Sequence, residues 1–445
     1  MDVSNKHELQ NGHVIFTKSH LVRAQHPRYP SGRCAVEHLS NEIADEAGQA
    51  ADTLILVSGN LTVTASTNPS PLPSIQLHNS TSVFLVPCKS SHEASYSITA
   101  LALDQSPPIS GHLNVAAFLS TGEFLVLSID HAHPSATTNK LTHLPSRRDD
   151  RSLVTHAAYH QSLLVSLSEN FTLSIYDLSS GSVRHSQTLS TFSSYPPTSI
   201  VLSSTTRELY KLVLAYSVPV YPSHWSVGAT ELLIGTPHSP ETLSSNTSAW
   251  ISPKAPGRVV STRTVRAFQV AEGWIDQGKL RLMREQWSRR VLRVADIQTD
   301  GRYVVLAAGD SSPFTTGSST PFTNAPSLHS PTNIQLYRLS LPMVSPSVAA
   351  PRPKLNFVRN LEGQNGPVSS IALADGRCVS YGVNGSIFVW DLDQGTGAEV
   401  AAPRSPPTPE SYSTAVFDRR SVTFDERRII TASGTGSVVV RRFDI

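Results

Sequence analysis

The chain has 445 residues, a formal net charge of +2, 16% charged residues and 39% hydrophobic residues. This balance is ordinary for a globular protein and excludes an acidic tail or a basic nucleic-acid-binding arm, so no nucleic-acid partner is expected. No window approaches about 18 uninterrupted apolar residues, and the N-terminal sequence MDVSNKHELQNG holds no apolar signal segment. We therefore expect no membrane partner and a cytoplasmic or nuclear location.

Cysteines and catalytic motifs give little sign of chemistry. Cys34, Cys88 and Cys378 are isolated, with no paired spacing that would indicate a disulfide framework or a zinc site. The sequence contains no phosphate-binding loop, nucleophile elbow or metal-ligand motif. We expect no catalytic residue, no metal and no cofactor, and a protein that is not an enzyme.

Short runs of β-branched and apolar residues, separated by turn residues, recur along the whole chain. In chain order they form seven groups: 53–57, 61–65, 74–77 and 83–86; 97–103, 115–119 and 123–129; 156–181; 199–202, 211–217 and 231–235; 291–297, 303–308 and 333–339; 361–395; and 421–445. Such repetition predicts an all-β chain built from small antiparallel sheets.

The clearest group is the sixth, which we interpret as one complete four-strand sheet. Val368–Leu373 and Arg377–Val383 are predicted strands, and Asn384-Gly385 is a strong hairpin signal because both residues of the favoured turn need positive φ. The next run ends in Trp390-Asp391. This order is typical of a blade in a WD-repeat β-propeller.

Two further groups repeat that order. The third ends its last strand in Tyr176-Asp177, and the seventh ends in Phe443-Asp444. The predicted fold is a seven-bladed WD-repeat-like β-propeller, which needs about 295 residues at about 42 per blade. The remainder falls in predicted Pro/Ser-rich insertions at 69–73, 237–256, 311–331, 341–353 and 403–411.

A propeller must close its last blade with a strand from the other end of the chain, or leave an open sheet edge. The seventh group supplies three strands, so the fourth must come from the N-terminal part. The run at 34–39 is the best candidate. We expect residues 1–33 to be a linker segment and residues 34–445 to be the propeller.

Two segments resemble F-box/WD-repeat proteins, the substrate receptors of cullin-based ubiquitin ligases. Residues 29–36, YPSGRCAV, resemble the turn and strand that lead from the F-box into the propeller, and residues 422–433 resemble the last blade. The F-box itself is not evident, because residues 1–28 are too short and polar for its helices. Gln364 replaces the usual His, and Asn384 and Asn170 replace the usual Asp, so we expect an incomplete buried polar network and more reliance on apolar packing.

Arginines gather in three predicted loops that lead into inner strands of the propeller. With one tryptophan, the candidate partner-binding residues are Arg147, Arg148, Arg151, Arg284, Trp287, Arg289, Arg290, Arg419 and Arg420. Guanidinium groups bind oxyanions with two parallel hydrogen bonds, so we hypothesise an anionic or phosphorylated peptide on this rim. Tyr221, His224 and Trp225 could add apolar anchors. The alternative is that these arginines are dispersed, solvated charges.

Two classes of function stay open. The resemblance implies a substrate-receptor-like scaffold linked to an SCF-type ubiquitin ligase, with Skp1 and cullin as partners if an F-box lies upstream. The alternative is a WD-repeat adaptor in another assembly, in RNA processing, trafficking or chromatin. Both bind proteins or peptides.

Overall fold

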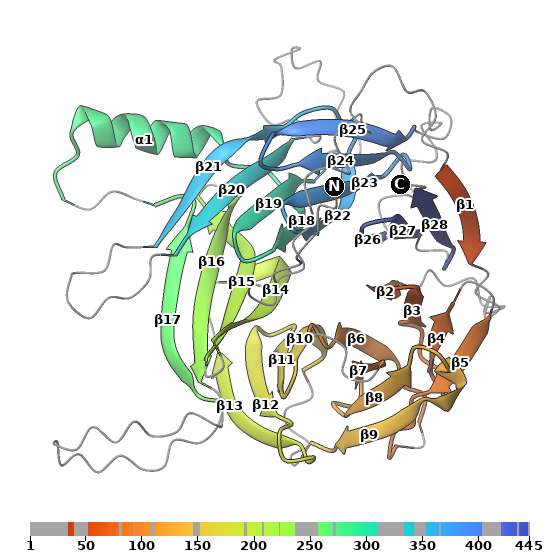
Figure 1. Ribbon diagram of the computed structural model, residues 1–445. Helices are drawn as coiled ribbons and strands as arrows, with labels where there is room; N and C mark the ends of the chain where they lie inside the picture. The colour runs from red at the N-terminus through yellow and green to blue at the C-terminus, as the bar shows by residue number, and fades with distance from the viewer. Residues whose placement is uncertain are drawn as a thin grey trace, which may run out of the picture.

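The computed structural model arranges seven four-stranded antiparallel sheets as blades around a central axis (Figure 1). The predicted all-β, seven-bladed propeller is confirmed. The structure describes residues 34–39, 52–79, 82–92, 94–106, 111–145, 152–190, 194–206, 209–221, 223–235, 257–269, 273–309, 333–341, 353–364, 366–402, 420–433 and 436–443. The predicted insertions at 237–256, 311–331 and 403–411, and most of 341–353, lie outside these residues.

Each blade runs from an inner to an outer strand. Blades one to three are β2 (Thr53–Ser58), β3 (Leu61–Ser66), β4 (Ser74–His78) and β5 (Val83–Pro87); β6 (Ile98–Leu103), β7 (His112–Leu119), β8 (Phe124–Asp130) and β9 (Thr138–His143); and β10 (Val154–His160), β11 (Leu163–Ser168), β12 (Thr172–Asp177) and β13 (Arg184–Ser190). A 3-10 turn, η1 (Pro134–Ala136), precedes β9.

Blades four to seven follow the same order. They are β14 (Tyr195–Thr206), β15 (Leu209–Val220), β16 (His224–Gly235) and β17 (Val259–Arg266); β18 (Val294–Thr299), β19 (Tyr303–Ala308), β20 (Ile334–Ser340) and β21 (Lys354–Leu361); β22 (Val368–Ala374), β23 (Arg377–Gly382), β24 (Ile387–Asp391) and β25 (Thr396–Ala401); and β26 (Ser421–Phe424), β27 (Arg428–Ala432), β28 (Val438–Phe443) and β1 (Cys34–Leu39).

The predicted bounds of the sixth blade are wrong. Leu361 ends β21, the outer strand of blade five, and the fourth strand of blade six, β25, begins only after Gly395. The outer strands β9, β13, β17 and β21 also lie outside the predicted runs. An outer strand has one free edge and one solvated face, so its sequence is mostly polar and carries a weak apolar alternation.

The ring closes between the two ends of the chain. The strand expected at 34–39 is β1, which pairs antiparallel with β28 from Cys34 opposite Phe443 to Leu39 opposite Val438. On the outside of this pair, Glu37 forms an ion pair with Arg442 at 2.9 Å. Blade seven thus contains strands from both terminal parts of the described chain.

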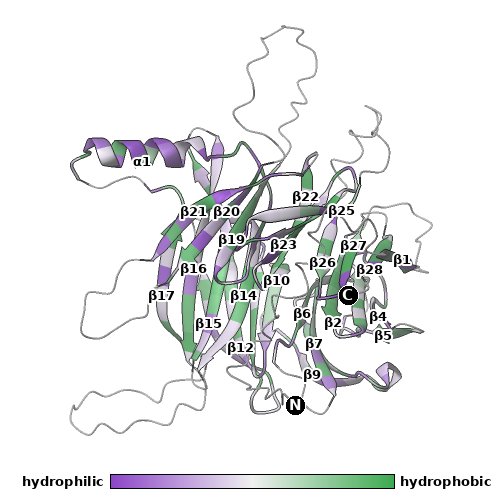
Figure 2. Cartoon of the chain, turned by 45° about the horizontal axis from the view of Figure 1, so that its top comes forward, coloured by the Kyte–Doolittle hydropathy of each residue, from purple (hydrophilic) through white to green (hydrophobic). Residues whose placement is uncertain are grey.

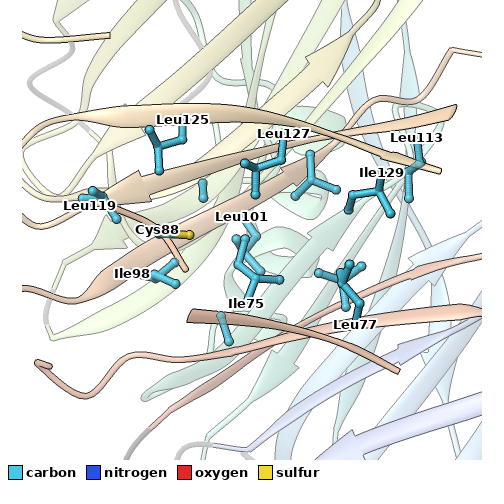
Figure 3. Close-up of a cluster of buried hydrophobic side chains, with 14 of the residues drawn as sticks. Ile75, Leu77, Cys88, Ile98, Leu101, Leu113, Leu119, Leu125, Leu127 and Ile129 are labelled. Atoms are coloured by element: carbon cyan, nitrogen blue, oxygen red, sulfur yellow. The ribbon is translucent and has the colours of Figure 1, made fainter. Parts of the chain in front are cut away.

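Apolar side chains fill the junction between each pair of neighbouring blades. Figure 3 shows the junction of blades one and two, where Ile75 and Leu77 of β4 lie opposite Leu125 and Leu127 of β8. Each fully buried side chain of this size contributes about 2 kcal/mol to folding. Cys88 lies in the same cluster, and burial raises the pKa of its thiol to about 12, which makes it a poor nucleophile.

The expected gap in the buried polar network of blade six is found only at Trp390, because Gln364 joins the other members. Gln364 donates through Nε2 to Ser386 Oγ at 2.6 Å and accepts from Ser380 Oγ at 2.5 Å. Ser386 in turn donates to Asn384 Oδ1 at 2.6 Å. An amide carries both a donor and an acceptor, so glutamine can connect two buried hydroxyls as an imidazole does. Trp390 takes no part in these hydrogen bonds, and its Nε1 donates instead to the backbone oxygen of Glu362 at 3.4 Å.

Within the described residues, no helix combines the length and the apolar character required to cross a membrane.

Candidate functional site

One end of the ring carries the loops that lead into each inner strand and the hairpins between second and third strands. We call this end the α1 rim, because α1 (Gln277–Ser288) lies in the loop from β17 to β18. Figure 1 shows α1 projecting beyond the outer edge of the ring near β21, and Figure 2 shows polar and apolar residues mixed on its surface. It is the longest helix of the described chain.

The helix α1 corrects the prediction of a loop that carries Arg284, Arg289 and Arg290 before the fifth blade. The signal was present: Asp276 is a good N-cap residue, and the segment after Gly278 consists mainly of strong helix formers. In the structure, the Asp276 carboxylate accepts a hydrogen bond from Lys279 N at 2.8 Å. No side chain of α1 is fully buried, and a helix of 12 residues is marginal in water by itself, so its cap and the contacts of its C-terminal end are both needed to hold it.

An aromatic cluster attaches the C-terminal end of α1 to blade four. The Trp287 ring centre lies 5.8 Å from that of Phe268 and 6.5 Å from that of His224, which begins β16. The Arg290 guanidinium lies 4.2 Å above the Trp287 ring, and its Nη1 donates to Trp287 O at 2.8 Å. Trp287 therefore anchors α1 to the propeller.

The other predicted anchors have different roles. Trp225 forms a backbone bridge with Val291 and packs edge-on against Tyr195, with ring centres 5.5 Å apart. Its ring is partly buried in the junction of blades four and five. Tyr221, at the tip of the β15–β16 hairpin, is 89% exposed. Thus Trp225 covers the core, whereas Tyr221 stays open to a partner.

The arginines of this segment differ in availability. Arg289 lies 4.2 Å from the Phe357 ring centre and 3.7 Å from a Glu285 oxygen, and its backbone oxygen accepts from Gln335 Nε2 at 2.8 Å. Arg290 is stacked on Trp287. Arg284 is exposed on α1 and forms no ion pair with any residue that the structure describes. Of these three guanidinium groups, that of Arg284 is the most accessible.

Arg420 is the one other predicted arginine that the structure describes, and it has a different role. Arg420 donates through Nη1 to the backbone oxygens of Gly382 and Val383, at 3.3 and 2.6 Å, and lies over the Tyr381 ring. It therefore holds the hairpin of blade six. Arg147, Arg148, Arg151 and Arg419 lie outside the described residues.

Sequence reasoning missed most of the exposed apolar side chains around α1. We define the α1 face as Tyr221, Trp274, Ile275, Leu280 and Leu282, all exposed. Trp274 is 87% exposed and Leu282 is 58% exposed. Scattered exposed hydrophobics are normal on a protein surface, but four bulky ones within residues 274–282, together with Tyr221 on the β15–β16 hairpin, are typical of an interaction site.

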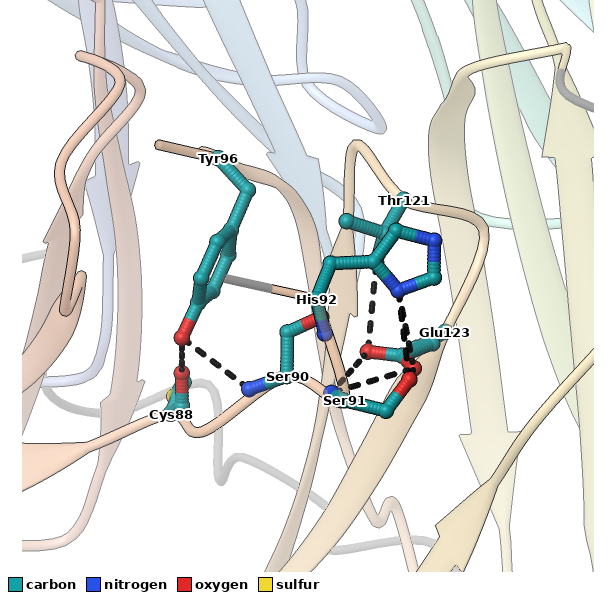
Figure 4. Close-up of polar contacts among 7 residues, drawn as sticks. All are labelled: Cys88, Ser90, Ser91, His92, Tyr96, Thr121 and Glu123. Carbon is teal, nitrogen blue, oxygen red and sulfur yellow. Dashed lines mark hydrogen bonds and ion pairs between the residues drawn. The ribbon is translucent and has the colours of Figure 1, made fainter. Parts of the chain in front are cut away.

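A cluster of polar side chains on the α1 rim lies between blades one and two (Figure 4). Ser91 donates from its backbone N to both oxygens of Glu123 at 3.2 Å, and its hydroxyl donates to Oε1. His92 Nδ1 lies 3.2 Å from Ser91 Oγ and 3.8 Å from Glu123. In the catalytic triad of a serine hydrolase, the histidine imidazole lies between the serine hydroxyl and the acidic side chain. Here the serine lies between them, so the group holds the loop in place.

The same loop has a second attachment. Tyr96 OH donates to Cys88 O at 2.9 Å and accepts from Ser90 N at 3.0 Å (Figure 4). Burial alone would raise the pKa of Glu123, but hydrogen bonds from Ser90, Ser91 and Thr121 outweigh it and lower the pKa. The ionised carboxylate is thus the form that fits this site.

Replacing Glu123 with glutamine should lower the free energy of unfolding by about 1.5 kcal/mol at pH 7. A depressed pKa in the folded state gives stability that is present above the unfolded value of about 4.3 and is lost as pH falls through the folded value. The difference between wild type and Glu123→Gln should therefore shrink as the pH is lowered below about 4. Urea unfolding at pH 7 and at low pH measures it, with exposed Glu399→Gln as the control. A difference that stays constant with pH would contradict the role of the charge.

Among the residues that the structure describes, no three His, Cys, Asp or Glu side chains gather as a metal site.

Comparison with known proteins agrees with the fold. The family described as "F-box protein pof12 beta-propeller" matches residues 52–264, which run from blade one into β17 of blade four. Two similar solved structures are the computationally designed Ika8 protein and the WD40 β-propeller domain of Doa1. Each is 12% identical and covers 89% of this chain and 97% of its own, with TM-scores of 0.37 and 0.39. No curated protein matches.

The seven blades, the closing strand and the family match together identify the chain as a WD-like β-propeller that resembles the propellers of fungal F-box proteins.

Proposed function

We propose that this protein is a non-enzymatic scaffold that holds a partner protein on the α1 rim, with the α1 face as its main docking surface. The observation that carries this proposal is a helix with no fully buried side chain, preceded in the chain by the exposed side chains of Trp274 and Ile275. Keeping such side chains in water is unfavourable unless a partner covers them. The rigid attachment of Trp287 to blade four keeps the surface in place.

The resemblance to F-box protein propellers supports a role as a substrate-receptor-like subunit linked to an SCF-type ubiquitin ligase. In that role the α1 face would hold the substrate, while Skp1 and cullin would be reached through an F-box. The alternative is an adaptor in another cytoplasmic or nuclear assembly, such as one for RNA processing, trafficking or chromatin. Both roles use the same docking surface.

An anionic or phosphorylated peptide remains our proposal for the bound segment. Of the predicted arginines that the structure describes, Arg284 is best suited to it, because its side chain is exposed on α1. Arg289, Arg290 and Arg420 already stack on aromatic rings of the propeller. They would contribute mainly through their positive charge.

Affinity purification of the tagged full chain, followed by quantitative mass spectrometry, tests the proposal. Substituting both Trp274→Ser and Leu282→Ser should reduce recovery of the main partner at least about tenfold, because two apolar anchors are lost. Val260→Ser, which removes an exposed side chain on β17, is the matched control. Recovery of Skp1 and cullin would decide for the ubiquitin-ligase role, and recovery of the subunits of another assembly would decide for the adaptor. Partner recovery that is unchanged in the double variant would refute docking on the α1 face.

A further inference from the structure

We propose that the α1 face binds an acidic segment of a partner protein, in which bulky apolar side chains are interspersed with Asp or Glu. This inference rests on the proposed scaffold function and specifies the chemistry of the partner. Three features of the segment 274–290 support it: its charge, the distribution of its apolar side chains and its fixed conformation.

Positive charge is concentrated on this segment. Residues 274–290 carry five basic side chains, Lys279, Arg281, Arg284, Arg289 and Arg290, against two acidic ones, Asp276 and Glu285, which leaves a net charge of +3. The chain as a whole carries only +2. The other residues together carry a net charge of −1, so the segment is more basic than the chain taken as a whole.

Both acidic side chains of the segment already have partners inside it. Asp276 caps α1 through Lys279 N, and Glu285 lies 3.1 Å from Arg281 and 3.7 Å from Arg289. The surplus positive charge is thus not cancelled within the segment. Arg284 is exposed and, among the described residues, has no ion-pair partner. A partner with negative charge would be steered to this surface and would gain ion pairs there.

The apolar side chains favour a protein partner over a membrane. A helix that lies on a bilayer needs one continuous apolar stripe. On α1, successive residues are about 100° apart, so exposed Leu280 and Leu282 lie on different sides of the helix. The side that carries Trp287 is turned toward Phe268 and His224. A peptide can wrap around the helix and contact both leucines, whereas a flat bilayer can contact only one side of it.

The conformation of the segment is fixed before binding. Asp276 caps the first turn, and the last turn is held by the ring contacts of Trp287 and by the bond from Gln335 to Arg289 O. Little conformational entropy of the α1 face is then lost when a partner binds. A preformed surface of this kind suits a flexible acidic segment, which supplies the adaptation itself.

Selection of a phage-displayed library of random peptides, about 16 residues long, against the full chain tests the inference. We expect the enriched peptides to combine several Asp or Glu with Leu, Phe or Trp. Synthetic versions with a fluorescent label should bind the wild type, and added salt should weaken the binding because exposed charges are screened. The Trp274→Ser and Leu282→Ser double variant should weaken binding at least about tenfold, and Arg284→Glu several-fold.

Arg266→Glu on β17 is the matched control, since it makes the same change of charge on an exposed arginine outside the α1 face. The inference would be overturned if the enriched peptides were basic or if no peptide were enriched. It would also be overturned if the α1 variants bound the peptides as tightly as the wild type does. Wild-type binding to vesicles of phosphatidylserine and phosphatidylcholine that is as tight as peptide binding, and is lost in the α1 variants, would also overturn it. Such a result would point to a membrane as the partner. If partners are still recovered from cells in these cases, the scaffold function stands and only the chemistry of the partner is wrong.

Discussion

Replacing Arg428 with alanine should lower the free energy of unfolding by about 3 kcal/mol, because it removes a buried guanidinium that pairs with Asp425 within blade seven and donates hydrogen bonds to blade one. The Arg428 guanidinium is buried and donates to Asp425 Oδ2 at 2.7 and 2.9 Å. It also donates to Thr62 Oγ1 and to the backbone oxygens of Gly59 and Asn60 in blade one. Alanine would leave these acceptors in a partly closed space with no donor.

Urea unfolding measures the loss, and Arg427→Ala is the control, since the neighbouring arginine is exposed. Hydrogen exchange adds the location: the amides that pair β1 with β28 should exchange faster in Arg428→Ala, because Arg428 connects the blade that closes the ring to blade one. Amides between blades three and four should change little. A variant as stable as Arg427→Ala would show that β1 pairing and apolar packing alone keep the ring closed.

Most of the fold could be predicted because the central strands of a blade have a strong local signal. β23 and β24 have buried residues on both faces and are joined by Asn384-Gly385, so their pattern and their turn both appear in the sequence. The outer strands lack this signal. In β25, Thr396, Gly397 and Glu399 are exposed, and only pairing with β24 defines them as a strand. Tertiary context decides such strands.

The candidate site was harder to predict than the fold. The sequence indicated an arginine-rich loop at residues 284–290. It did not show that Arg290 stacks on Trp287 or that Arg289 stacks on Phe357. Phe357 is about 70 residues away in the chain and lies beside α1 only through the blade arrangement. The use of Gln364 in a buried network was missed for the same reason, because its partners become neighbours only after folding.

Trp390→Ala should have the largest effect on stability of any substitution considered, lowering the free energy of unfolding by about 4 kcal/mol. Trp390 is only 1% exposed and stacks on Phe388, with ring centres 5.5 Å apart. Its ring also fills the space beside Gly397, where a Cβ would lie 2.5 Å from the indole, so the neighbouring backbone is already as close as glycine allows. The cavity left by alanine cannot be filled by a small shift of one side chain.

Two further variants separate packing from hydrogen bonding. Trp390→Phe keeps most of the apolar volume but loses the bond from Nε1 to Glu362 O, and should cost about half as much as alanine. Trp274→Ala removes the same side chain from an exposed position and should change stability by less than about 0.5 kcal/mol. Equal losses for Trp390→Ala and Trp274→Ala in urea unfolding would contradict the packing argument. Because the buried ring stabilises blade six and the exposed ring lies on the α1 face, the two tryptophans should affect different measurements: Trp390 the unfolding free energy, and Trp274 the binding of a partner.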